Sequence, residues 1–268
     1  VIACDQHTSD RAYWNALDAF VGDKPSTLRL TLPEIYLEDA DCPARIVRIA
    51  EEMRAYRARG IFRTLPPGFI LVQRKTPFSP VRTGIVLAVD LEAYSFERQS
   101  SALIRATEAT ILERIPPRLK IREAADLEFP HILLLYEDMQ DAVVAAARAH
   151  RGETLYDFEL NMGGGHIRGD FIPDVQPVLD AFEGLVRDGL LFMVGDGNHS
   201  LATAKAAWER RKADLSEEER AAHPARFALC EAVNIYDRGI RFEAIHRLVK
   251  GVDPDDFVRG LRPSGTAE

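Results

Sequence analysis

The sequence predicts an α/β or α+β fold in which a mixed sheet is covered by helices. Short apolar runs typical of buried strands alternate with segments whose apolar residues recur every three or four positions, and Gly or Pro separates many of them. The chain has 268 residues and 46% hydrophobic content, enough to bury a substantial core. We find no internal repeat, low-complexity tract or long linker, and therefore expect one compact domain over residues 1–268.

Charge and composition limit which binding partners and which cellular compartment we expect. The formal net charge is -8, which argues against a surface dedicated to nucleic acid. The cysteines Cys4, Cys42 and Cys230 are far apart and form no CxxC pair, so we expect a reducing compartment and no zinc site. No apolar run is long enough for a membrane span and no signal peptide opens the chain. We expect a cytoplasmic protein with no membrane partner, and, because the first residue is not Met, a fragment of a longer product.

Helical periodicity is found in several segments. One helix begins after Ser9 or Asp10 and carries Trp14 and Leu17 on its apolar face. Apolar residues also recur at helical spacing over 43–59, 101–117, 138–150 and 175–187, and the charged segment 213–222 predicts a solvated helix. We expect the helix over 43–59 to pack on the sheet.

Runs of strand type lie between these segments. They cover residues 27–32, 69–74, 82–90, 129–137, 154–160, 166–169, 191–194, 227–233 and 242–245. The run at 129–137 is the most apolar and predicts a central strand. The link between 69–74 and 82–90 contains prolines, which predicts a connection too irregular for a tight hairpin.

The stretch 190–212 combines a strand, a glycine loop and a helix. Its loop, here called the GDGNHS loop (residues 195–200), places Gly195, Asp196 and Gly197 between the strand and a helix for which Ser200 is the expected N-cap. Such a loop directs backbone N–H groups and the positive end of a helix at one point, where phosphates and carboxylates bind. The functional candidates at that point are Asp196, Asn198 and His199.

Another interpretation of the loop is structural. The glycines then only turn the chain, and Asn198 and His199 are helix-cap residues in solvent. The loop matches neither GxxxxGK[ST] nor GxGxxG, so no standard nucleotide motif decides between the two interpretations.

Two further clusters could carry chemistry. The expected helix over 101–117 leaves Arg105, Thr107 and Glu108 at one end, where Arg105 could face an anion and Glu108 could accept a proton or hold a metal; alternatively, Arg105 and Glu108 form an ordinary surface pair. His166 and Arg168 follow three glycines, which suits either a phosphate loop or a hairpin tip. His246 and Arg247, after the run 242–245, are weaker candidates.

Sequence blocks along most of the chain resemble one family. GDGNHSLATAK resembles the DGHHR-type strand–loop–helix of a bacterial and archaeal family of unknown function, and LIRATEATILERIPPRLKIREAADLEFPHILLLYED resembles its central block. VIACDQ, PSTLRLTLPE and HPARFALCEAVN extend the likeness. The family is often grouped with the ParB/sulfiredoxin-like proteins, which include nucleotide-dependent switches and free-serine kinases. Here Asn198 replaces the first His of the motif and Ser200 replaces its Arg, so one expected phosphate-binding cation is missing.

This resemblance implies a ParB/sulfiredoxin-like core over about residues 69–212 and a nucleotide-dependent small-molecule phosphotransferase similar to free-serine kinases. ATP or ADP with magnesium is the implied cofactor. The catalytic residues would be Asp196, Glu108 and His199, with Asp196 or Glu108 orienting a hydroxyl or magnesium and His199 assisting proton transfer. The residues expected to bind the nucleotide are Gly195, Gly197, Asn198, Ser200, Arg105, Thr107, His166 and Arg168.

Two alternatives belong to other functional classes. A ParB-like regulator would bind a nucleotide and change shape without turning over a metabolite. A non-catalytic scaffold would have lost its ligand, which would explain the altered motif. The discriminating observation is whether the block around residues 105–108 meets the GDGNHS loop in one pocket.

Overall fold

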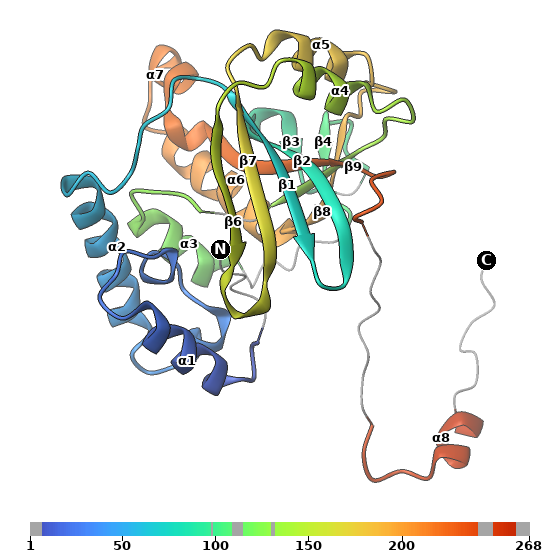
Figure 1. The fold of residues 1–268 in the computed structure, drawn as a ribbon. Helices are drawn as coiled ribbons and strands as arrows, with labels where there is room; N and C mark the ends of the chain where they lie inside the picture. The colour runs from blue at the N-terminus through green and yellow to red at the C-terminus, as the bar shows by residue number, and fades with distance from the viewer. Residues whose placement is uncertain (1–6, 98, 109–114, 130–131, 241–248, 261–268) are drawn as a thin grey trace.

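The computed structural model describes residues 7–97, 99–108, 115–129, 132–240 and 249–260, and their α/β architecture agrees with the predicted class. Its nine-stranded mixed sheet has the order β3-β4-β8-β5-β9-β2-β1-β7-β6 (Figure 1). In chain order the strands are β1 Phe69–Thr76, β2 Ser79–Asp90, β3 Tyr94–Ser95, β4 Ile104–Arg105, β5 Leu133–Tyr136, β6 Thr154–Leu160, β7 Gly165–Ile172, β8 Phe192–Asp196 and β9 Phe227–Asn234. Strand β5 lies inside the sheet, as its apolar run predicted.

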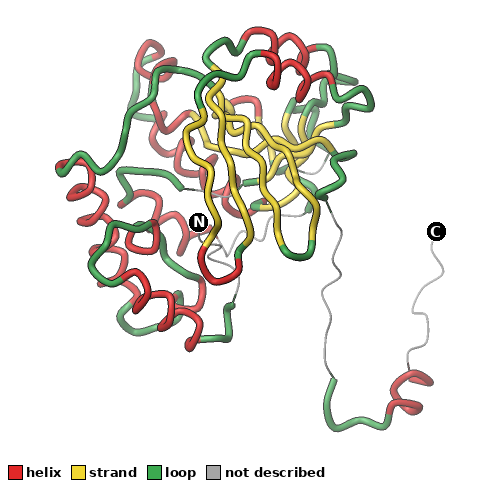
Figure 2. The backbone as a smooth tube through the Cα atoms, viewed as in Figure 1, coloured by secondary structure: helices red, strands yellow, loops and turns green. Residues whose placement is uncertain are grey.

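Helices lie above the sheet and to its left, with a further group at the lower left (Figure 2). They are α1 Arg11–Val21, α2 Cys42–Ala58, α3 Ile115–Ala124, α4 Ala142–Ala149, α5 Gln176–Glu183, α6 Asn198–Lys212, α7 Glu217–Ala222 and α8 Pro254–Gly260. Helix α1 begins as predicted, because the Asp10 side chain accepts a hydrogen bond from the backbone N–H of Tyr13 at 3.0 Å. In the part of the chain that is described, no helix is long and apolar enough to cross a membrane.

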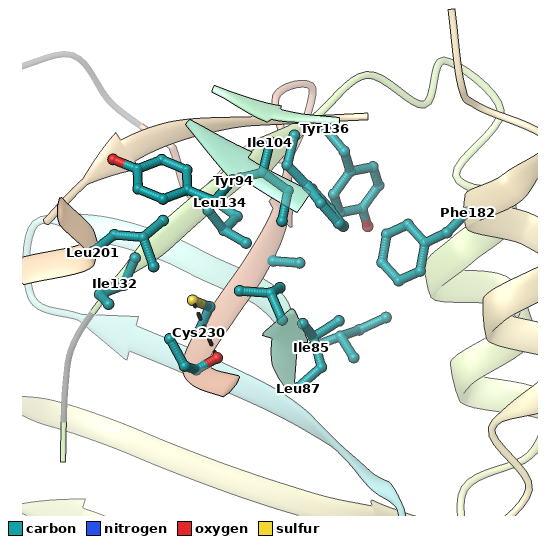
Figure 3. Packing of buried hydrophobic residues seen from close by; sticks show 14 of the residues in the cluster. Ile85, Leu87, Tyr94, Ile104, Ile132, Leu134, Tyr136, Phe182, Leu201 and Cys230 are labelled. Atoms are coloured by element: carbon teal, nitrogen blue, oxygen red, sulfur yellow. Dashed lines mark hydrogen bonds between the residues drawn. The ribbon is translucent and has the colours of Figure 1, made fainter. Parts of the chain in front are cut away.

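The main core is organised by one row of side chains across five neighbouring strands. Leu71, Ile85, Ala232, Leu134 and Val194 are paired in register and each is at most 1% exposed. Helices α4, α5 and α6 complete this core. In Figure 3, Phe182 of α5 and Leu201 of α6 lie on opposite sides of the cluster.

A second, smaller core joins the N-terminal segment to helix α2. Leu30, Ile49, Met53 and Tyr56 are its buried members, and Leu127 and Phe129 pack against them. The predicted packing of the 43–59 helix on the sheet is therefore wrong: the apolar face of α2 contacts this second core.

Two predictions for the N-terminal half of the chain also differ from the structure. Residues 27–32 do not form a strand; Thr27–Arg29 is a short 3₁₀ helix, in which the Ser26 hydroxyl caps the N–H of Leu28 at 3.2 Å. The alternating leucines had suggested a half-buried strand, but they serve the second core. Strands β1 and β2 form a tight hairpin with Thr76 paired to Ser79, so the intervening Pro77 and Phe78 make a compact turn after all.

The predicted helix over 101–117 is wrong at its beginning. Ile104–Arg105 is a short strand parallel to β8, and among the described residues helix α3 covers Ile115–Ala124. A buried Ile104 satisfies strand and helix patterns equally, and its pairing with Phe192 decides for the strand. The predicted strand 242–245, together with His246 and Arg247, lies outside the described residues.

The row of buried side chains gives a direct stability test. Leu134→Ala should lower the free energy of unfolding by about 2–5 kcal/mol, because a completely buried side chain is replaced by a cavity in the central strand. Urea unfolding of the purified protein measures the change. Leu179→Ala on α5, where the side chain is exposed, is the matched control and should cost far less. Equal losses for the two variants would contradict the assignment of β5 to the core.

Candidate functional site

The GDGNHS loop connects the end of β8 to the first turn of α6. Gly197 is the N-cap and takes the left-handed conformation, with φ 82° and ψ 26°, which favours glycine. Helix α6 begins at Asn198, so the predicted N-cap at Ser200 is wrong: Gly197 is the N-cap, three residues before the expected position. Among the described residues no side chain caps the helix, and the N–H groups of its first turn have no acceptor within the helix.

The glycines of the loop have different roles. Gly195 belongs to β8, and a Cβ there would lie 2.7 Å from Cγ of Leu135, so its small size serves packing within the sheet. Gly197 donates its N–H to Oδ1 of Asp196 at 2.7 Å, which holds that carboxylate against the turn. Only Gly197 is therefore required by the geometry of the helix entry.

Asn198 joins the loop to the residues after β4. Its side chain is buried; Oδ1 accepts a hydrogen bond from the backbone N–H of Thr107 at 3.2 Å, and Nδ2 donates to Oγ1 of Thr107 at 3.1 Å. The Thr107 hydroxyl in turn donates to the carbonyl of Val194 at 2.6 Å. The two sequence blocks therefore meet, and Asn198 makes the connection.

His199 and Glu108 form the polar pair of this junction. Nδ1 of His199 lies 3.9 Å from Oε1 of Glu108, and the imidazole is 16% exposed while the carboxylate is 60% exposed. The half-buried imidazole is thus held beside an accessible carboxylate, an arrangement suited to accepting a proton and stabilising the resulting positive charge.

This junction borders a cavity of about 1160 Å³, here called the α3–α6 cavity. One face of helix α6 packs in the core, where Leu201, Ala204 and Trp208 are buried. Residues at helical spacing on its other face line the cavity. The lining includes Asp196, Gly197, Asn198, His199, Ser200, Thr203, Ala207, Arg210, Arg211, Glu108, Arg118, Arg122 and part of the second core. A cavity of this size can hold a ligand as large as a nucleotide.

The cavity contains arginines that the sequence analysis did not select. Arg118 contacts Glu34 at 3.1 Å and Arg122 contacts Glu128 at 2.5 Å, both pairs partly buried. The signal was present in the sequence, because Arg118 and Arg122 are separated by one helical turn and so share a face of α3. It was missed because helix α3 was expected to begin earlier and to end at residue 117.

Arg105 does not reach the loop. It lies on β4 opposite Met193, and its side chain turns back, donating from Nε to the carbonyl of Ala102 at 2.8 Å and from Nη2 to that of Asp188 at 3.3 Å. Because β4 runs parallel to β8, these carbonyls lie at the opposite end of β8 from the GDGNHS loop.

His166 and Arg168 are placed on β7, and the sheet order separates that strand from β8 by four others. Nε2 of His166 lies 2.8 Å from Asp157, and Arg168 bonds Asp170 at 3.0 Å. Gly165 lets the chain approach the backbone of Lys75, since a Cβ there would lie 2.0 Å from its carbonyl oxygen. The triple glycine is thus the tip of the β6–β7 hairpin.

Comparison with known proteins identifies a family. The family model described as protein of unknown function (DUF1015) matches residues 1–266. No curated protein and no solved structure matches the chain.

The contact between Asn198 and Thr107 should be measurable as a coupling energy between the two side chains. In a double-mutant cycle of Thr107→Val and Asn198→Ala, the two stability losses should be non-additive by about 0.5–1.5 kcal/mol, because each change removes the same hydrogen bond. Urea unfolding of the single and double variants measures the cycle. Thr107→Val paired with Asn161→Ala, on the distant hairpin, should be additive. Additivity in the first pair would contradict the junction.

The Arg168 cluster predicts a pH-dependent contribution to stability. Burial alone would raise the pKa of Asp170, but hydrogen bonds from Arg168 and Thr154 outweigh it and hold the pKa below its usual 3.8. The ionised carboxylate therefore stabilises the fold above about pH 4, and this contribution is lost as the pH falls through the lowered pKa.

Asp170→Asn should accordingly reduce stability by about 1–3 kcal/mol at neutral pH, with the difference from wild type shrinking below about pH 4. Urea unfolding across pH 2–7 is the measurement. The exposed Asp23→Asn serves as the control. A deficit that does not change with pH would show that the Asp170 carboxylate charge has no part in it.

Proposed function

This chain belongs to the DUF1015 family of proteins of unknown function, and from the geometry of its site we propose that it is a nucleotide-dependent small-molecule phosphotransferase resembling free-serine kinases. The observation that carries the proposal is the meeting of Thr107 and Glu108 with Asn198 and His199 at the uncapped end of α6, on the wall of the α3–α6 cavity.

Nucleotide binding is supported by size and by charge. ATP or ADP would place its phosphates at the first turn of α6, where the backbone N–H groups of Asn198, His199 and Ser200 and the positive end of the helix favour anions. Its remainder would occupy the cavity toward α3. Arg118 and Arg122 would bind the phosphates in place of the missing Arg of the motif. Phosphate oxygens can replace the carboxylates that these two arginines now contact.

The proposed reaction transfers a phosphoryl group to a hydroxyl such as that of free serine. The hydroxyl oxygen attacks the terminal phosphorus of the nucleotide, the bond between that phosphorus and the leaving diphosphate oxygen breaks, and the hydroxyl proton passes to His199. Glu108 stabilises the protonated imidazole, and Asp196 orients the hydroxyl. Arg105, His166 and Arg168 take no part in this version of the site, because their side chains are engaged elsewhere.

Magnesium would bind together with the phosphates of the nucleotide. In the described residues no group of three or more His, Cys, Asp or Glu side chains is arranged to hold a metal, whereas Asp196 and Glu108 line the same cavity singly. Such a pair suits an ion that takes most of its ligands from phosphate and water. Magnesium bound there would neutralise charge on the transferred group.

Membership of the ParB/sulfiredoxin-like group and a cytoplasmic location belong to the same proposal. The GDGNHS strand–loop–helix within residues 69–212 supports the first. The thiols support the second, since Cys42 and Cys230, the cysteines that the structure describes, are free, as is usual in a reducing compartment.

Nucleotide binding can be tested by thermal shift. ATP or ADP with magnesium should raise the melting temperature of the purified protein, because a ligand bound only by the native state stabilises it. CTP and magnesium-free samples are run in parallel. His199→Ala should reduce the shift strongly, while the control His150→Ala, on the surface at the end of α4, should leave it intact. No shift with any nucleotide would overturn the proposal.

Turnover distinguishes the kinase from the two alternatives. Incubation with ATP, magnesium and free serine, followed by mass spectrometry, should yield ADP and phosphoserine, and Glu108→Gln should slow this reaction about 10–100-fold or more if the carboxylate assists proton transfer. A nucleotide-dependent shift without product from any small hydroxyl acceptor would favour a ParB-like regulator. Absence of both would favour a scaffold.

A further inference from the structure

A second pocket lies on the face of the sheet opposite the main row of buried side chains. It is formed by β1, β2, β7 and β9 and has a volume of about 150 Å³, here called the arginine pocket. Val72, Val86 and Ile167 give it apolar walls, and Arg74, Arg82 and Glu231 are the charged residues among its described lining. None of these residues belongs to the α3–α6 cavity.

The carboxylate of Glu231 already forms an ion pair with Arg82. Nη2 of Arg82 lies 3.0 and 2.9 Å from the two carboxylate oxygens, and the side chains are only 21% and 12% exposed. Gly84 makes room for this pair, because a Cβ at that position would lie 2.5 Å from Oε1 of Glu231. The carboxylate is therefore held across β2 toward Arg82.

Arg74 has no carboxylate of its own among the described residues. Its Nη2 donates to the carbonyl of Gly164 at 3.2 Å, while its Nε is buried and finds no acceptor; Nε of Arg82 is likewise buried without one. Burial lowers the pKa of Arg74, and the positive charge of Arg82 lowers it further. Two guanidiniums and one carboxylate among the described lining leave the pocket with one positive charge in excess, and a partly buried cation without a matching anion is costly.

We propose that the arginine pocket binds a small monoanionic carboxylate with a short aliphatic chain. One negative charge balances the excess, and carboxylate oxygens match guanidinium N–H donors, including the two unsatisfied Nε groups. The aliphatic chain packs against Val72, Val86 and Ile167. The volume matches this class of ligand, since a cavity of about 150 Å³ holds a molecule the size of benzene.

This site is independent of the proposed phosphotransfer. In the sheet register Glu231 faces Leu133, and Leu133 faces Asp196, so the pocket lies two strands from the GDGNHS loop, on the order of 10 Å at the usual strand spacing. The two ligands can therefore be tested separately.

Isothermal titration calorimetry with butyrate tests the pocket. The purified protein should bind butyrate saturably, and Arg74→Met, which keeps the length of the side chain and removes its charge, should weaken binding about tenfold or more. The exposed Arg54→Met is the matched control and should bind as wild type does, as should His199→Ala. Circular dichroism establishes that each variant is folded.

Other probes define the outcomes. Inorganic phosphate binding more tightly than butyrate would overturn the carboxylate assignment, and 1-butanol binding equally well would overturn the role of the charge. Because Arg74→Met could unfold the protein, methyl NMR of the wild type gives a second measurement. Butyrate should shift the Val72, Val86 and Ile167 methyl signals. Shifts confined to Leu30 and Leu127 of the α3–α6 cavity, or no saturable binding, would overturn the proposal.

Discussion

Burial of a single row of side chains sets the geometry of the whole sheet. Leu71, Ile85, Ala232, Leu134 and Val194 can all be removed from water only in the register observed, because a shift of one residue would turn each of them to the other face. The same register places Val86, Glu231, Leu133 and Asp196 in line on the opposite face. The core therefore determines where both candidate ligand sites lie, and the carbonyl of its member Val194 accepts a hydrogen bond from Thr107 at the first of them.

Asn198 has a structural role at the entry of helix α6. A second histidine at this position could not supply both an amide oxygen and an amide nitrogen to the backbone N–H and the hydroxyl of Thr107. The amide thus holds the loop against Thr107, after β4, with His199 beside Glu108.

The sequence predicted local structure correctly where a pattern is compatible with only one kind of element. The apolar run ending in Tyr136, the strand–glycine–helix order around Gly197 and the Asp10 cap all gave the correct local structure. Ile104 and Leu30 were misassigned because a short apolar segment fits a strand, a helix or a loop over a core, and distant partners choose among these. Glu108 could be associated with His199 through the family resemblance, whereas Arg74, Arg82 and Glu231 are brought together only by pairing across β1, β2 and β9.

The position of β9 has a consequence for how the protein is made. This strand is the last to be synthesised among those described in the sheet, yet it lies between β5 and β2, near the middle. A nascent chain that ends before Phe227 has to keep the edges of β2 and β5 apart and unpaired, each exposing backbone groups and apolar side chains that invite wrong partners. The ribosome must release most of the chain before the two halves of the sheet can join, so assembly is necessarily a late and long-range event.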